Sequence, residues 1–229
     1  MDTFLHPIII LLFTSLSWLH QYTLDWGFAI IALTVIVRML LFPLNLRTAR
    51  QQYRQVKMQP VLSALRDKYA KDQAKLLQET GKAYQQYGVK PLSLFIVSLI
   101  QAPLFLSLYR VFSTHGATMS SHIVPWISTL GQSDPFHLVP LIYAGITFIS
   151  MIVPLTNEMT VTGSLLTRLS MPLIMVLIMA IVMWSSPVAI GLYWTTNSLF
   201  AIAERLFYRT VIGRRWISRG SELQAAAGV

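Results

Sequence analysis

Residues 29–45 read AIIALTVIVRMLLFPLN, and this stretch decides how the rest of the chain is interpreted. It is apolar enough to cross a membrane, yet Arg38 lies within it. A guanidinium in hydrocarbon costs roughly 2.5–3.5 kcal/mol on insertion scales. It cannot escape this cost by losing a proton, because its pKa is above about 12. A charge kept at such a cost indicates a specific role.

The composition is typical of a membrane protein. The chain has 229 residues, of which 54% are hydrophobic and 12% are charged, whereas a soluble domain carries about 25% charged residues. Apolar runs of roughly 20 residues recur, as expected for transmembrane helices. The absence of cysteine excludes disulfides, thiolate catalysis and Cys-ligated metals. We therefore predict an all-α polytopic membrane protein.

Five spans are predicted, each close to the length that a helix needs to cross about 30 Å of hydrocarbon. In chain order, the prediction is an outer-face interfacial helix (1–25), span 1 (26–46), a cytoplasmic helical hairpin (47–91), span 2 (92–112), an outer loop (113–135), span 3 (136–155), a cytoplasmic loop (156–168), span 4 (169–186), span 5 (189–208) and a cytoplasmic tail (209–229).

The basic residues orient these spans. Of 18 Lys and Arg residues, ten lie in 47–91, one in 156–168 and four in 209–229, whereas residues 1–26 and 113–135 contain none. Cytoplasmic loops carry the excess of Lys and Arg. The N-terminus is therefore predicted outside, and the hairpin and C-terminus in the cytoplasm.

Two segments allow more than one interpretation. The apolar stretch Ile8–Leu19 is short for a span, and Trp18 and Tyr22 suit an interface, so we predict an interfacial helix; the alternative is a sixth span. In the hairpin, Asp72 is a candidate N-cap and Gly88 a candidate helix stop. The alternative for the hairpin is a solvated connector held to the membrane by its basic residues.

Arg38 shares a helix face with two other polar residues, Thr34 and Asn45. In an unbroken helix Arg38 would lie about 12 Å from Leu46, which is beyond the reach of its side chain. It therefore needs water or a partner. Glu204 is the candidate for a structural ion pair, but a water-filled cavity around an unpaired charge is the favoured interpretation.

Spans 2 and 5 offer polar side chains that can line such a cavity. One buried Gln or Asn is commonly an interhelical hydrogen-bonding residue, but a convergence of polar residues from three spans is harder to explain by packing. The predicted groove residues are Thr34, Arg38, Asn45, Ser98, Gln101, Tyr193, Trp194 and Asn197.

No motif for an enzyme is present. The sequence contains no P-loop and no metalloprotease helix, its five histidines are scattered over the outer segments, and the basic hairpin has no nucleic-acid-binding signature. We expect no cofactor, no metal, no covalent chemistry and no sequence-specific binding of nucleic acid. The methionines at 171, 175, 179 and 183 form a stripe that packing or lipid contact explains most simply.

Three stretches resemble the YidC family of membrane protein insertases: WGFAIIALTVIVRMLLFPL (26–44), GVKPLSLFIVSLIQAPLFLSLYRVF (88–112) and SSPVAIGLYWTTNSLFAIAERLFYR (185–209). The resemblance covers about 4–209. It implies a hydrophilic groove that is open to cytoplasm and lipid and closed toward the outside, with Arg38 as its charge. It also implies a mobile cytoplasmic hairpin and a bacterial cytoplasmic membrane location. No additional N-terminal span, outer domain or lipoprotein cysteine is expected.

The function expected from this resemblance is insertion of nascent membrane proteins, which are the partners together with lipids. The ribosome and the Sec translocon are further candidate partners, although the short tail argues against strong binding of the ribosome. The competing class is an ion or solute transporter that uses the intramembrane arginine; internal repeats and broken helices at the midplane, which are typical of transporters, are not visible in the sequence. A structural membrane scaffold is a third possibility.

Overall fold

The computed structural model describes residues 2–90, 93–155 and 165–219, without the side chains of 2–4, 93–100 and 165–168. All regular structure in these residues is helical, so the all-α prediction is confirmed. The chain divides into two compact units. The first comprises Met1–Leu41, Leu99–Pro154 and Val161–Glu204; the second comprises Phe42–Ser98, Leu155–Thr160 and Arg205–Val229.

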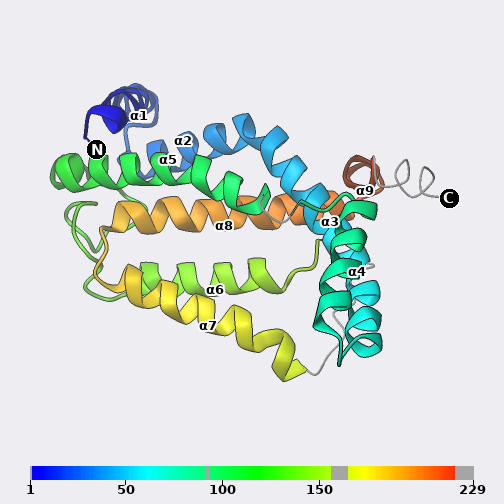
Figure 1. The fold of residues 1–229 in the computed structure, drawn as a ribbon. Helices are drawn as coiled ribbons and strands as arrows, with labels where there is room; N and C mark the ends of the chain where they lie inside the picture. Colours follow the sequence, from blue (N-terminus) through cyan, green and yellow to red (C-terminus); the bar gives the residue numbers. More distant parts are fainter. Residues whose placement is uncertain (1, 91–92, 156–164, 220–229) are drawn as a thin grey trace. The chain divides into compact units, whose positions relative to one another are not determined.

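Helices α1 and α2 lie along each other in the first unit, as do α6 and α7; in the second unit α3 packs against α4 and α9 (Figure 1). The elements are α1 (Asp2–Thr23), α2 (Trp26–Leu40), α3 (Phe42–Lys68), α4 (Gln73–Gln86), α5 (Ser93–His115), the 3-10 turn η1 (Gly116–Thr118), α6 (Leu138–Ile152), α7 (Leu165–Trp184), α8 (Val188–Arg209) and α9 (Val211–Ser218).

The helix expected over 26–46 is broken. Helix α2 ends at Leu40, Leu41 is its C-cap, and α3 begins at Phe42. Pro43 explains the break, because proline donates no backbone hydrogen bond, clashes with the carbonyl four residues earlier, and is tolerated in the first turn of a new helix. The last residues of the predicted first span therefore belong to α3.

Helix α6 is shorter than the span expected over 136–155, with 15 residues. His137 precedes it in a left-handed conformation (φ 53°), and Val153 ends it in an extended one, as favoured before Pro154. None of the helices in the described residues combines, on its own, the length and apolarity of a membrane span. Only α2 and α3 meet that standard as a pair, with the break at Leu41 between them.

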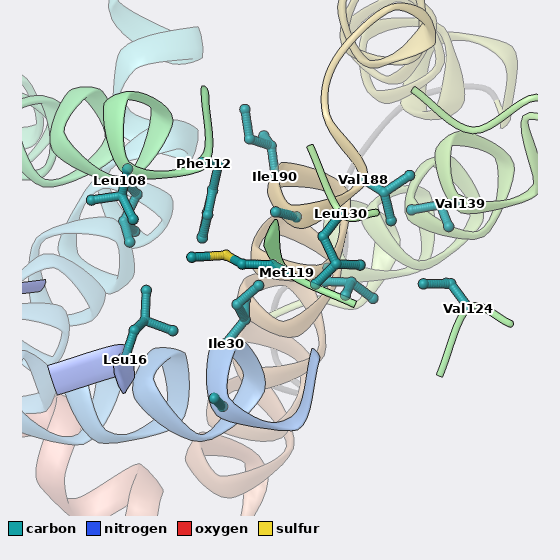
Figure 2. Close-up of a cluster of buried hydrophobic side chains, with 14 of the residues drawn as sticks. Leu16, Ile30, Leu108, Phe112, Met119, Val124, Leu130, Val139, Val188 and Ile190 are labelled. Atoms are coloured by element: carbon teal, nitrogen blue, oxygen red, sulfur yellow. The ribbon is translucent and has the colours of Figure 1, made fainter. Parts of the chain in front are cut away.

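One apolar cluster forms the core of the first unit and joins α1, α2, α5, α6, α8 and the loop at 116–137, and Met183 of α7 is also buried in it. Figure 2 shows side chains from these elements converging around Met119, which is fully buried. Phe112 and Ile190 are also almost completely buried. The loop therefore contributes to the core.

The backbone of this loop is bonded to the beginnings of two helices. Trp26 N–H donates to the carbonyl of Ser120 at 3.3 Å, and Ala189 N–H donates to that of Leu130 at 3.0 Å. Gly116 and Gly131 approach so closely that a Cβ on Gly116 would lie 2.6 Å from Cα of Gly131. The outer loop predicted over 113–135 is thus a packed element, and its first three residues extend α5.

The second unit contains the two helices predicted in 47–91. Asp72 caps α4 by accepting a hydrogen bond from Lys75 N–H at 3.0 Å, and Gly88 follows the helix with φ 60°, so both capping predictions are confirmed. Met58 and Leu62 of α3 pack against Ala83 of α4. Ala83 is the one residue of α4 that is buried, so this contact is small.

Candidate functional site

Arg38 lies in the last turn of α2, because the helix is broken three residues later. The sequence placed it in the middle of a longer helix, and this expectation is wrong. The free carbonyls at a helix C-terminus favour a cation by typically 0.3–1 kcal/mol. The break at Leu41 therefore offsets part of the cost of keeping Arg38 charged.

The partner of Arg38 is a neutral amide. Its Nε donates a hydrogen bond to Oδ1 of Asn197 in α8, and the two atoms are 2.5 Å apart. Among the described residues no carboxylate forms an ion pair with Arg38, so the alternative of an ion pair with Glu204 finds no support. Asn197 fixes the guanidinium in place and leaves its charge uncompensated.

A small cavity lies beside this pair, between α2, α5 and α8 of the first unit. The volume in which the centre of a water molecule fits is about 20 Å³. This is just above the roughly 10–15 Å³ that one water requires. Five of the eight predicted groove residues line it together with three apolar ones: Thr34, Arg38, Gln101, Tyr193 and Asn197 with Val37, Leu41 and Leu104.

Thr34 contributes little to the polarity of this cavity. Its side chain is 5% exposed, and its hydroxyl donates to the carbonyl of Ile30 at 2.6 Å. A separate apolar cavity lined by Leu16, Ile30 and Phe112 shares Thr34 and Tyr193 with this pocket. The polar side chains of the pocket are therefore mainly those of Arg38, Gln101, Tyr193 and Asn197.

Trp194 is the predicted residue of the first unit that does not line this pocket. Trp194 follows Tyr193 on the helix and points to another face, where its ring stacks on Phe105 at 5.2 Å and lies 5.5 Å from that of Tyr143. Asn45 is half-buried in the second unit. Ser98 belongs to α5, and its side chain lies outside the described residues.

Two buried carboxylates that we did not predict as functional hold the outer loop. Asp25, 5% exposed, caps α2 through Phe28 N–H and accepts from Ser121 Oγ at 2.7 Å and from His122 N–H at 2.6 Å. Burial opposes ionisation, but these hydrogen bonds outweigh it and lower the pKa of Asp25 from 3.8 to about 2. The carboxylate is therefore ionised at neutral pH, and its bonds tie α2 to the loop.

Asp134 has the corresponding role at α6. It is 2% exposed and accepts hydrogen bonds from Val139 N–H at 2.8 Å, Phe136 N–H at 3.0 Å and the indole of Trp126 at 3.0 Å. Burial opposes ionisation here too, but the hydrogen bonds dominate and lower its pKa. Asp25 lies directly before α2, where a capping role could have been read from the sequence. Asp134 lies four residues before α6, whose N-cap is His137.

No group of His, Asp and Glu side chains within the described part of the chain is arranged to hold a metal ion. The cytoplasmic loop expected at 156–168 and the end of the tail, from residue 220, fall mostly or entirely outside the described residues, as does the side chain of Arg168.

The comparisons with known proteins identify the family of this chain. The profile of the family described as 60Kd inner membrane protein matches residues 18–214, and the chain therefore belongs to that family. It is 31% identical over 217 residues to the membrane protein insertase YidC of Bordetella pertussis, covering 94% of this chain and 36% of that protein. It is 30% identical over 196 residues to the membrane protein insertase YidC of Syntrophus aciditrophicus, covering 86% of this chain and 35% of that protein.

A solved structure shares the fold. The crystal structure of an active YidC insertase with its first transmembrane domain resolved matches with a TM-score of 0.65 and 26% identity, over 91% of this chain and 46% of that one. The chain spans about a third of the length of the curated relatives it matches. It is a membrane protein of this family.

Proposed function

We propose that the protein is a membrane protein insertase, which moves short hydrophilic segments of nascent membrane proteins across the bilayer and releases their apolar segments into lipid. The observation that carries this proposal is the Arg38 guanidinium, held by the neutral Asn197 at 2.5 Å beside a cavity that can admit water. The relatives named as insertases support the same assignment.

The charge of Arg38 supplies attraction to acidic residues of an arriving segment. Two opposite charges 4 Å apart attract each other by about 4 kcal/mol at an effective dielectric constant of 20, and by about 1 kcal/mol in water. Because Asn197 is uncharged, this attraction remains available to the substrate. An arginine paired with a carboxylate would have lost most of it.

Apolar partitioning supplies the free energy of the overall process. Once the hydrophilic segment has entered the polar pocket, the apolar segment gains roughly 25 cal/mol for each Å² it removes from water. Neither a covalent step nor nucleotide hydrolysis is needed, and we propose no cofactor. The proposed partners are nascent membrane proteins and lipids, with the ribosome and the Sec translocon as candidates.

The proposed topology has five spans around a hydrophilic groove, an outer interfacial helix and a cytoplasmic hairpin. The N-terminus is outside, and the hairpin and C-terminus are in the cytoplasm, because the basic residues concentrate there. The packed outer loop, tied to α2 by Asp25 and to α6 by Asp134, supports closure of the groove toward the outside.

Reconstitution tests the proposal against the transporter alternative. The purified chain in proteoliposomes is expected to insert a small membrane protein that is synthesised in their presence, so that an externally added protease no longer degrades the translocated segment. The same vesicles are expected to retain an entrapped ion indicator. Leakage of ions or solutes without insertion would contradict the proposal and favour a transporter.

A further inference from the structure

The C-terminal helix α9 exposes apolar side chains and has only a narrow buried face. Gly213 and Ile217, four residues apart, are buried. On the remaining surface Val211 is 71% exposed, Ile212 is 60% exposed and Trp216 is 41% exposed. In water this surface would be unfavourable, because each such side chain gains about 1.5–3 kcal/mol when fully buried.

Helix α9 is fixed where it lies within the second unit. Thr210 caps it by accepting from Gly213 N–H at 3.2 Å, and a Cβ on Gly213 would lie 2.0 Å from the carbonyl oxygen of Phe207. The chain therefore turns tightly at the end of α8. At the other end of α9, Arg50 of α3 donates to the carbonyl of Trp216 at 2.9 Å. The exposed apolar side chains are thus held on a defined surface.

Cationic residues surround this surface. Arg215 is exposed on the same side of α9 as Val211 and Ile212, and Arg219, the C-cap residue of the helix, is exposed as well. Across residues 42–60 of α3 and 205–219, the sequence contains nine Arg and Lys and no Asp or Glu. These two segments meet where α3 packs against α9. In these two segments, exposed apolar side chains therefore occur together with a net positive charge.

We propose that α9 is an interfacial helix that binds the anionic headgroups of a phospholipid bilayer, with Arg215 and Arg219 at the phosphates and Val211, Ile212 and Trp216 among the upper acyl carbons. A helix that combines Lys and Arg with Trp and aliphatic residues lies in the plane of such an interface. This goes beyond the proposed function and rests only on its placement of residues 209–219 at the cytoplasmic surface.

RNA, including ribosomal RNA, would also be attracted to the arginines, but it does not account for the apolar residues. RNA-binding surfaces combine cationic grooves with aromatic rings on which bases stack. The ring of Trp216 lies 5.5 Å from that of Phe207 and 6.1 Å from that of Phe42, so it is partly occupied within the protein. The aliphatic side chains of Val211 and Ile212 favour a lipid surface.

The experiment uses the full chain in vesicles and exploits the absence of natural cysteines. A nitroxide is attached to Ile212→Cys, and its collisions with oxygen, which enters lipid, are compared with its collisions with a water-soluble nickel chelate. Leu77→Cys, a 75% exposed apolar position on α4 near Glu79 and Lys75, is the control. The vesicles contain phosphatidylcholine alone or mixed with phosphatidylglycerol.

When phosphatidylglycerol is present, we expect the label at 212 to collide more often with oxygen and less often with the nickel chelate. The collision rates of the label at 77 are expected to stay those of a label in water. Each arginine near an anionic surface contributes roughly fivefold to binding, or about 1 kcal/mol. Adding Arg215→Gln and Arg219→Gln is therefore expected to reverse most of the shift.

Three results would overturn the inference. The first is a label at 212 that remains in water with both lipid compositions. The second is a label that lies equally deep in both kinds of vesicle. The third is a label that is shielded from the nickel chelate only when RNA is added. Each of these readings is independent of insertion activity, so a failure here is distinguishable from a failure of the proposed function.

Discussion

Replacing Asp25 with asparagine removes the charge that ties α2 to the outer loop and changes little else. The carboxylate uses both oxygens: Oδ1 accepts from Phe28 N–H and Ser121 Oγ, and Oδ2 accepts from His122 N–H and lies 3.0 Å from Nδ1 of the His122 ring. Asparagine offers one oxygen, and its NH₂ group would face a second donor. At least one buried N–H or O–H therefore loses its partner in Asp25→Asn.

The pKa of Asp25 indicates how much free energy of unfolding the substitution removes. It falls from 3.8 to about 2 on folding, and each pKa unit corresponds to about 1.4 kcal/mol, so the ionised carboxylate contributes about 2 kcal/mol. An unpaired buried donor costs about 1–3 kcal/mol. Because these two estimates describe largely the same bonds, we expect Asp25→Asn to lower the free energy of unfolding by about 2–3 kcal/mol.

The pH dependence provides a second test. Because the pKa is lower in the folded state, the stabilisation is fully present above the unfolded value of 3.8 and is lost as the pH falls toward about 2. The difference between wild type and variant is therefore expected to be constant near neutral pH and to shrink below about pH 4. Unfolding in mixed detergent micelles measures it. Ser121→Ala is the comparison: it keeps the carboxylate but loses two hydrogen bonds, from Ser121 Oγ to Asp25 and from Ile123 N–H to Ser121 Oγ, each worth about 1 kcal/mol. Equal stability of Asp25→Asn and wild type at neutral pH would show that the Asp25 carboxylate does not stabilise the fold.

Three further predictions concern topology, packing and mobility. Cysteines introduced at the exposed positions Ser120 and Gln78 are expected to react with membrane-impermeant reagents from opposite sides, Ser120 from outside; labelling of both from one side would contradict the five-span topology. Gly116→Ala is expected to lower the free energy of unfolding by about 1–3 kcal/mol, because its Cβ would meet the backbone of Gly131 at 2.6 Å; Gly81→Ala, with nothing within 4 Å of its added Cβ, is the control. Amides of α4, with one buried residue, are expected to exchange with solvent faster than those of α2 and α8, and equal protection would show that the hairpin is not mobile.

The sequence predicted the local features of this structure well where one residue determines them. The N-cap at Asp72 and the stop at Gly88 follow from side-chain chemistry and backbone freedom, and both are confirmed. The convergence of Arg38, Gln101, Tyr193 and Asn197 could be predicted because polar residues in apolar helices avoid lipid. The role of that cluster in binding a substrate stays a prediction.

Other features depend on contacts that no local pattern reveals. The break at Leu41 could have been inferred from Pro43, but its consequence for Arg38, a position at a helix C-terminus, requires the geometry. The hydrogen bond between Arg38 and Asn197 joins residues 159 apart in the chain. The bonds of Asp25 to Ser121 and His122 join residues 96 and 97 apart.

In the proposed mechanism, an uncompensated positive charge at Arg38 attracts acidic segments of the substrate. Asn197→Asp tests it, because aspartate has nearly the same shape, keeps the acceptor that lies 2.5 Å from Nε of Arg38, and adds a compensating charge. Asn197→Ala removes the hydrogen bond but not the charge, and Arg38→Lys keeps a charge without the guanidinium.

The most direct measurement is the insertion of one model substrate, with zero, one or two acidic residues in its translocated segment, into proteoliposomes that contain each variant. Asn197→Asp and Arg38→Ala are expected to lose the faster insertion of acidic segments and to keep insertion of the uncharged segment. Arg38→Lys and Asn197→Ala are expected to retain most of that advantage. If Asn197→Asp inserts acidic segments as well as wild type does, while Asn197→Ala remains folded and active, the charge of Arg38 is not what attracts the substrate.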